Sequence, residues 1–117
     1  MNTNKNVELP LENLYKLENY VIYKDEEATV EAKKAVKNHL FKYPELVASF
    51  LGMDSIVCRV AAQNGFKANE SFENLLNDDK GVDDFATYVI NTYGRGVILS
   101  ANDVELCFVD HFAYLKD

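Results

Sequence analysis

Few residues in this chain of 117 amino acids have the types and spacing that catalysis requires. Cys107, Asp110 and His111 lie close together near the C-terminus and could supply a nucleophile, an orienting acid and a base. A cysteine nucleophile needs its base within hydrogen-bond reach and a third group that orients the base. The alternative is a half-buried strand cysteine beside a surface histidine, and we favour it. We therefore expect a protein that is not an enzyme.

The residues that commonly bind metals are also sparse. Cys58 and Cys107 are the only cysteines, and no CxxC pair or His/Cys quartet exists, which argues against a structural zinc site within one chain. His39 lies on the apolar side of a predicted helix and is interpreted as structural. The carboxylates at 78–79 and 83–84 could bind calcium, but they do not follow the calcium-loop pattern. We predict no metal and no cofactor.

The strongest pattern is electrostatic. Residues 1–69 hold equal numbers of acidic and basic side chains, so the whole net charge of −7 lies in residues 70–117. Acidic residues are most concentrated in residues 70–84. One interpretation of this acidic stretch is a solvated loop with two helix starts, where carboxylates are favoured. The other is a surface that steers a basic partner toward it. The candidate partner-binding carboxylates are Glu70, Glu73, Asp78, Asp79, Asp83 and Asp84.

The most distinctive local motif is Tyr93-Gly94-Arg95-Gly96, where two glycines let the backbone turn sharply around an arginine. Arg95 is interpreted either as a structural residue or as an interface residue, since arginine is enriched at binding hot spots. As a structural residue it would pair with an acid such as Asp83, Asp84 or Asp103. As interface residues, Tyr88, Tyr93 and Arg95 would be the anchors nearest the acidic surface.

The elements that must position these residues follow from the spacing of apolar side chains. Residues 1–10 are predicted to form an N-terminal tail, and residues 11–117 a single helix-rich α+β domain of five or six helices. Helices are predicted over about 11–21, 25–41, 44–51, 54–63, 71–76 and 85–93, with a short strand over 20–23 as an alternative at the end of the first. Residues 97–99, 104–109 and 112–115 predict a C-terminal antiparallel β-hairpin or three-stranded meander.

Composition excludes several classes of protein. No apolar run approaches the roughly 20 residues that span a bilayer, and residues 1–11 are polar, so neither a transmembrane helix nor a signal peptide is expected. Direct nucleic-acid binding requires lysines and arginines that displace the counterions of the phosphates. It is disfavoured here because the chain has a net charge of −7. We expect a cytoplasmic protein without membrane contact. If a phage encodes it, the expected compartment is the cytoplasm of the bacterial host.

The segment Tyr93-Gly94-Arg95-Gly96, followed by Leu99-Ser100 and then Asp103 and Glu105, resembles a pattern found in small proteins of phages and conjugative elements. Those acidic proteins accompany anti-CRISPR and antirestriction inhibitors, several of which present carboxylates in place of nucleic-acid phosphates. The resemblance carries no catalytic residue across. It implies an inhibitor whose partner is a basic nucleic-acid-binding protein, such as a CRISPR effector or a restriction enzyme.

These observations lead to one expected function and two alternatives. We expect a non-enzymatic inhibitor that occupies the basic groove of a nucleic-acid-handling defence protein with its acidic surface. An immunity protein or antitoxin that neutralises a basic nuclease toxin would have the same composition. A homodimer or larger homo-oligomer with a structural role is the other alternative, because seven tyrosines and seven phenylalanines can leave an apolar patch exposed.

Overall fold

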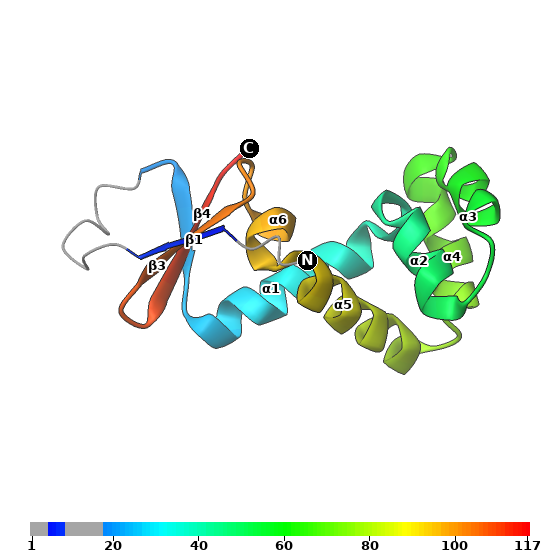
Figure 1. Cartoon of the computed structure of the whole chain (residues 1–117), viewed down its shortest axis with the longest axis horizontal. Helices are drawn as coiled ribbons and strands as arrows, with labels where there is room; N and C mark the ends of the chain where they lie inside the picture. Colours follow the sequence, from blue (N-terminus) through cyan, green and yellow to red (C-terminus); the bar gives the residue numbers. More distant parts are fainter. Residues whose placement is uncertain (1–4, 9–17) are drawn as a thin grey trace. The chain divides into compact units, whose positions relative to one another are not determined.

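The structure is a computed structural model that describes residues 5–8 and 18–117 (Figure 1). It confirms the predicted helix-rich α+β class. In chain order the elements are β1 (Lys5–Glu8), β2 (Tyr20–Tyr23), α1 (Asp25–Asn38), the 3₁₀ turn η2 (Leu40–Lys42), α2 (Pro44–Leu51), α3 (Ser55–Ala62), the 3₁₀ turn η3 (Gly65–Ala68), α4 (Asn69–Leu75), α5 (Asp79–Tyr93), α6 (Arg95–Leu99), β3 (Val104–Phe108) and β4 (His111–Leu115).

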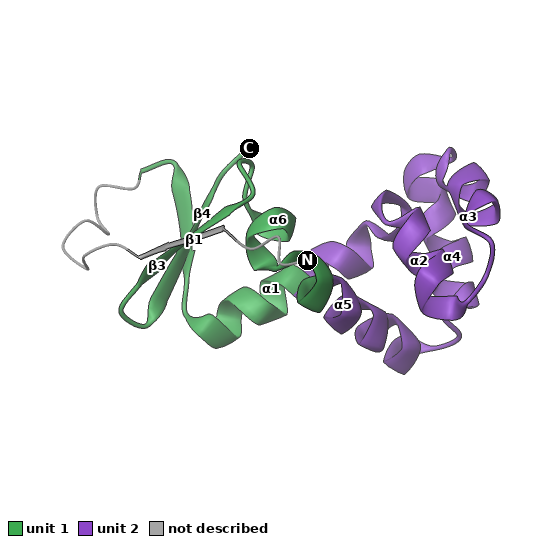
Figure 2. Ribbon diagram, in the orientation of Figure 1, with its two compact units in different colours: residues 1–32, 90–117 green, residues 33–89 purple. Residues whose placement is uncertain are grey.

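The chain divides into two compact units (Figure 2). Unit 1 comprises residues 1–32 and 90–117, and unit 2 comprises residues 33–89. The boundaries between them fall within α1 and α5. None of the helices in the described ranges is long and apolar enough to cross a membrane.

Unit 1 is built on a four-stranded sheet with the strand order β1-β3-β4-β2. β3 and β4 form the predicted C-terminal hairpin, and Asp110 closes its short turn with a left-handed backbone (φ 63°). β2 pairs with β4 antiparallel, and β1 pairs with β3 parallel. The sheet therefore recruits two strands from the N-terminal end of the chain, which the prediction of a hairpin or meander did not include.

The N-terminal predictions need correction. Residues 5–8 were predicted to be part of a tail, but they form β1, because backbone hydrogen bonds to β3 supply a pairing that no local apolar pattern reports. The predicted helix over 11–21 lies mostly outside the described residues. At its end, the alternative prediction of a short strand over 20–23 is confirmed as β2.

Residues 97–99 were predicted to form a strand and are instead the second half of the helix α6. Gly94 precedes this helix with φ 88°, and Gly96 lies against the backbone of β3. A Cβ atom at position 96 would be 2.9 Å from both the carbonyl oxygen of Asp103 and the amide nitrogen of Glu105. This close approach, a tertiary contact, overrides the strand propensity of the valine and isoleucine that follow.

In unit 2, the helix predicted over 44–51 has these bounds as α2, whereas α5 begins at Asp79 and not near residue 85 as predicted. Pro44 is the first residue of α2, and Gly52 ends it with a left-handed backbone (φ 69°). The Asp54 carboxylate caps α3 by accepting the amide hydrogen of Ile56 at 2.9 Å. The core of the unit is formed by fully buried side chains, the largest of which are Phe72, Phe85, Leu40, Val36, Val47, Val89 and Cys58.

Replacing Gly96 should destabilise unit 1. In Gly96→Ala the new methyl group meets backbone atoms of Asp103 and Glu105, which cannot rotate away, so we expect the free energy of unfolding to fall by about 1–3 kcal/mol. Urea denaturation followed by circular dichroism measures this change. An unchanged midpoint would show that α6 and β3 are not held as close together as described.

Candidate functional site

Six carboxylates between residues 70 and 84 are the predicted partner-binding groups, and all of them lie in unit 2. Glu70 and Glu73 are exposed on α4, one helical turn apart. The remaining four lie in the turn that follows α4 and in the first turns of α5. The two helices thus bring both halves of the acidic stretch into the same unit.

The turn between α4 and α5 has a defined local geometry. Asn77 has a left-handed backbone (φ 85°), and the Asp78 carboxylate caps α5 by accepting the amide hydrogen of Gly81 at 2.8 Å. A side chain at position 81 would overlap the carbonyl group of Leu76, so the turn requires glycine there. The Asp78 carboxylate is therefore held at the start of α5, in the residue before Asp79.

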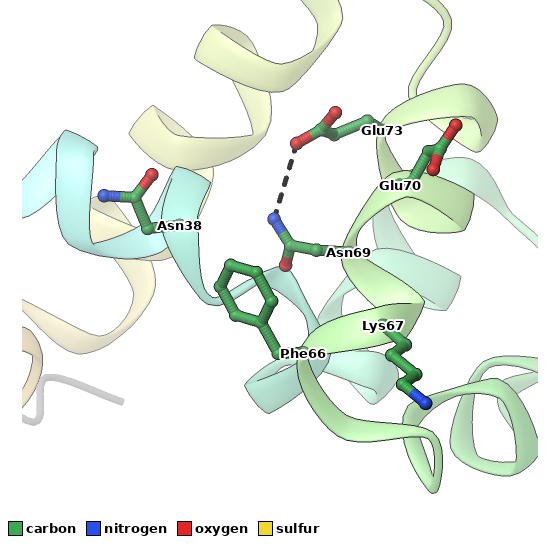
Figure 3. Close-up of a pocket in the computed structure, with 6 residues that line it drawn as sticks. All are labelled: Asn38, Phe66, Lys67, Asn69, Glu70 and Glu73. Carbon is green, nitrogen blue, oxygen red and sulfur yellow. Dashed lines mark hydrogen bonds between the residues drawn. The ribbon is translucent and has the colours of Figure 1, made fainter.

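Four of the six carboxylates line two adjoining hollows of about 520 and 340 Å³. The hollows share Asn38, from the end of α1, and Glu73, and Figure 3 shows the larger of them. We call the two together the acidic groove. Its lining residues are Lys37, Asn38, Phe66, Lys67, Asn69, Glu70, Glu73, Asn74, Asn77, Asp78, Asp79 and Val82.

Asn69 ties the walls of the acidic groove together. Its side chain is buried, with 7% of the residue exposed, and its Oδ1 accepts the amide hydrogen of Leu40 at 2.6 Å. Its Nδ2 donates to the carbonyl oxygen of Lys37 at 2.8 Å and to Glu73 Oε1 at 3.4 Å (Figure 3). One amide thereby connects the end of α1, the turn η2 and the first turn of α4.

The six carboxylates divide into a paired and an unpaired set. Asp83 accepts hydrogen bonds from Lys37 (2.9 Å) and Lys33 (3.3 Å), and these bonds hold the pKa of its carboxyl below the usual range. Asp84 pairs with Lys80 at 3.1 Å. Within the described ranges no ion pair involves the other four, which are Glu70, Glu73, Asp78 and Asp79.

Tyr88 lies in unit 2 but does not line the acidic groove. Its ring packs 5.4 Å from that of Phe50 and 6.3 Å from that of Phe85, and its hydroxyl group is 3.3 Å from Ser49 Oγ. The prediction that it anchors a partner beside the carboxylates remains a prediction. Tyr93 also lies outside the lining of the groove and belongs to unit 1.

Arg95 belongs to unit 1, where its side chain is 13% exposed. The predicted partners were Asp83, Asp84 or Asp103, but the observed partners are Asp25, at 2.7 Å from Nη1, and Glu105, at 3.0 Å from Nε. The guanidinium carbon of Arg95 lies over the ring of Phe112, 4.7 Å from the ring centre. Desolvation alone would lower the pKa of Arg95, but the hydrogen bonds to Glu105 and Asp25 outweigh it and raise the pKa.

Glu105 is buried and shared between two donors. Its Oε2 accepts from Arg95 and, at 2.6 Å, from the hydroxyl group of Tyr114. Burial, followed by the bond to the carboxylate, raises the pKa of Tyr114 far above its ordinary value of 10.0. These bonds link α1, α6 and both strands of the hairpin, which supports the structural interpretation of Arg95.

The sheet separates the residues that could have formed a cysteine–histidine pair. Cys107 is opposite Phe112 in the register and His111 is opposite Phe108, so the cysteine and the histidine lie on opposite faces. The His111 ring lies 3.2 Å from the carbonyl oxygen of Val109. Across residues 5–8 and 18–117, no three His, Cys, Asp or Glu side chains gather closely enough to hold a metal ion.

Two exposed apolar features were not recognised in the sequence. Ile56, Val57 and Val60 of α3 are each more than half exposed, while Cys58 of the same helix is fully buried. Phe66 is 68% exposed and lines the acidic groove. Apolar periodicity alone cannot reveal that these side chains are exposed. It identifies an apolar face but not whether another element covers that face.

The ion pairs of Asp83 should make stability depend on pH. A carboxyl with a lowered pKa stabilises the folded state above its ordinary value of 3.8, and this contribution is lost as the pH falls through the folded-state value. We expect Asp83→Asn to have a lower urea midpoint of unfolding than the parent protein at neutral pH. In strong acid the difference between the two midpoints should be smaller. Asp84→Asn is the matched control, with a smaller effect because its pair with Lys80 is more exposed. A difference that is equally large at every pH would contradict this assignment.

Comparisons with protein-family models, with curated proteins and with solved structures gave no match for this chain. The function proposed below is therefore based on the side chains and contacts of the chain itself. The feature with the clearest chemical character is the acidic groove.

Proposed function

We propose that this protein is a non-enzymatic binding protein that inhibits a nucleic-acid-handling protein by placing the acidic groove against its basic surface. The observation that carries the proposal is the set of four exposed carboxylates that line the groove without an ion pair to any described residue. The proposed contact therefore uses four of the six carboxylates predicted from the sequence. The other two, Asp83 and Asp84, do not line the groove and already pair with lysines.

The proposed mechanism is occlusion. Each carboxylate of the groove would accept hydrogen bonds from a lysine or arginine that otherwise contacts phosphate, and such charge-assisted bonds impose orientation. The net charge of −7 would raise the rate of encounter with a basic partner. The Asp78 carboxylate is held by its bond from the amide of Gly81 and Glu73 by Asn69, so binding would require little ordering of these two side chains.

An immunity protein or antitoxin would use the same groove in the same way. The nature of the captured partner distinguishes the two roles. A nuclease toxin indicates immunity, and a restriction enzyme or CRISPR effector indicates inhibition of host defence.

The test is an affinity capture from a bacterial lysate at low and at raised salt, followed by an activity assay of the captured protein. We expect a basic nucleic-acid-binding protein whose activity is inhibited and whose capture weakens with salt, because exposed charge contacts are screened within about 10 Å at 0.1 M salt. The variant Glu70→Gln/Glu73→Gln/Asp79→Asn should abolish both capture and inhibition. It leaves the capping residue Asp78 in place.

The matched control for this variant is Glu18→Gln/Glu26→Gln/Glu45→Gln. It removes the same number of charges from exposed residues that do not line the acidic groove. We expect it to retain capture and inhibition. Equal loss in both variants would indicate a contribution from overall charge only, and retention in both would overturn the proposal.

A homo-oligomer is the second candidate, and the exposed apolar face of α3 favours it. Three β-branched side chains on adjacent turns, Ile56, Val57 and Val60, form an apolar surface of a kind that often marks an interaction site. In this case the parent protein should sediment as a dimer or larger species, and Ile56→Ser/Val60→Ser should sediment as a monomer. Val109→Ser, at a residue of similar exposure in the β3–β4 turn, serves as the control. A monomeric parent protein would exclude this candidate.

A further inference from the structure

The larger hollow of the acidic groove contains an exposed aromatic ring. Phe66, in the turn η3, is 68% exposed although it is apolar. Its ring meets that of Phe41 edge to face, with ring centres 6.2 Å apart and planes at 72°. The ring thus packs against one aromatic neighbour, and it also lines the hollow (Figure 3).

The polar groups around this ring are mainly hydrogen-bond acceptors. Glu73 and Glu70 contribute carboxylates, and Asn38 contributes an amide that can present its oxygen. The Glu73 carboxylate is held by the buried amide of Asn69. Lys67 is the basic residue of this lining, and Figure 3 shows its side chain extending away from Phe66 and Glu73.

An aromatic ring and a carboxylate that line the same hollow match the chemistry of a guanidinium group. Arginine stacks its planar cation on an aromatic ring and donates two parallel hydrogen bonds to a carboxylate. Lysine carries a compact and strongly hydrated charge, and it gains less from the ring. A hollow of about 520 Å³ leaves room for such a side chain.

We propose that this hollow is a binding site for an arginine side chain, with the guanidinium group stacked on Phe66 and hydrogen-bonded to Glu73. The site rests on the proposed function, since the arginine would come from the basic partner. It adds a specificity that negative charge alone does not provide, namely a preference for arginine over lysine at one position of the contact.

The experiment is an NMR titration of the isotope-labelled full chain with three blocked tripeptides, in which glycine flanks arginine, lysine or citrulline. Citrulline has nearly the shape of arginine but no charge. We expect the arginine peptide to shift the signals of Phe66, Glu73 and the side-chain amide of Asn69, with weaker shifts for lysine and none for citrulline. The measured quantity is the dissociation constant of each peptide.

Two variants test the assigned contacts. Phe66→Leu should weaken the binding of the arginine peptide about 2- to 5-fold, the equivalent of an exposed cation–π contact of about 0.5–1 kcal/mol, and remove the preference over lysine. Glu73→Gln should weaken both cationic peptides. Phe50→Leu, at another partly exposed phenylalanine of unit 2 that does not line the groove, should leave all three titrations unchanged.

The possible outcomes separate this inference from the proposed function. Equal binding of arginine and lysine peptides, or shifts spread over all the carboxylates, would overturn the arginine site and leave a groove that acts by charge alone. The absence of shifts with any peptide would also overturn it. The proposed function is judged separately, by capture and inhibition with the Glu70→Gln/Glu73→Gln/Asp79→Asn variant.

Discussion

The buried amide of Asn69 is the interaction on which the acidic groove depends. An amide inside a protein must satisfy its oxygen and its nitrogen, and Asn69 does so with Leu40, Lys37 and Glu73. Removing it would leave the buried amide of Leu40 without its partner, at a cost of about 1–3 kcal/mol. The same amide donates to Glu73, so one side chain both stabilises unit 2 and shapes its acidic groove.

Charge in this protein has two different roles. In unit 1, Arg95 and Glu105 are largely removed from water and are stabilised by hydrogen bonds from several elements, so their charges serve the fold. In unit 2, Asp83 and Asp84 pair with lysines at the surface, whereas four neighbouring carboxylates have no such partner among the described residues. Exposed carboxylates without a cation are available for a partner, and this difference, rather than the total charge, supports a binding function.

The exposed apolar residues indicate that recognition need not be electrostatic alone. Phe66 lies within the acidic groove, and the apolar face of α3 belongs to the same unit. Interfaces commonly combine an aromatic or apolar anchor with a polar surround that orients the contact. Unit 2 carries both kinds of group, so the mutational tests of charge and of apolar contact address separate contributions to binding.

Local signals in the sequence determined the helix-rich class, the start of α2 at Pro44, its end at Gly52 and the C-terminal hairpin, because proline, glycine and alternating apolar residues act on the chain directly around them. They also located the acidic stretch. Only the tertiary structure decided that residues 5–8 join the sheet, that residues 97–99 are helical and that Arg95 pairs with Asp25. Which carboxylates line a groove, and that Phe66 lies among them, was likewise decided by packing. The reason is that each of these features depends on contacts between different elements of the fold, and short-range periodicity contains no information about such contacts.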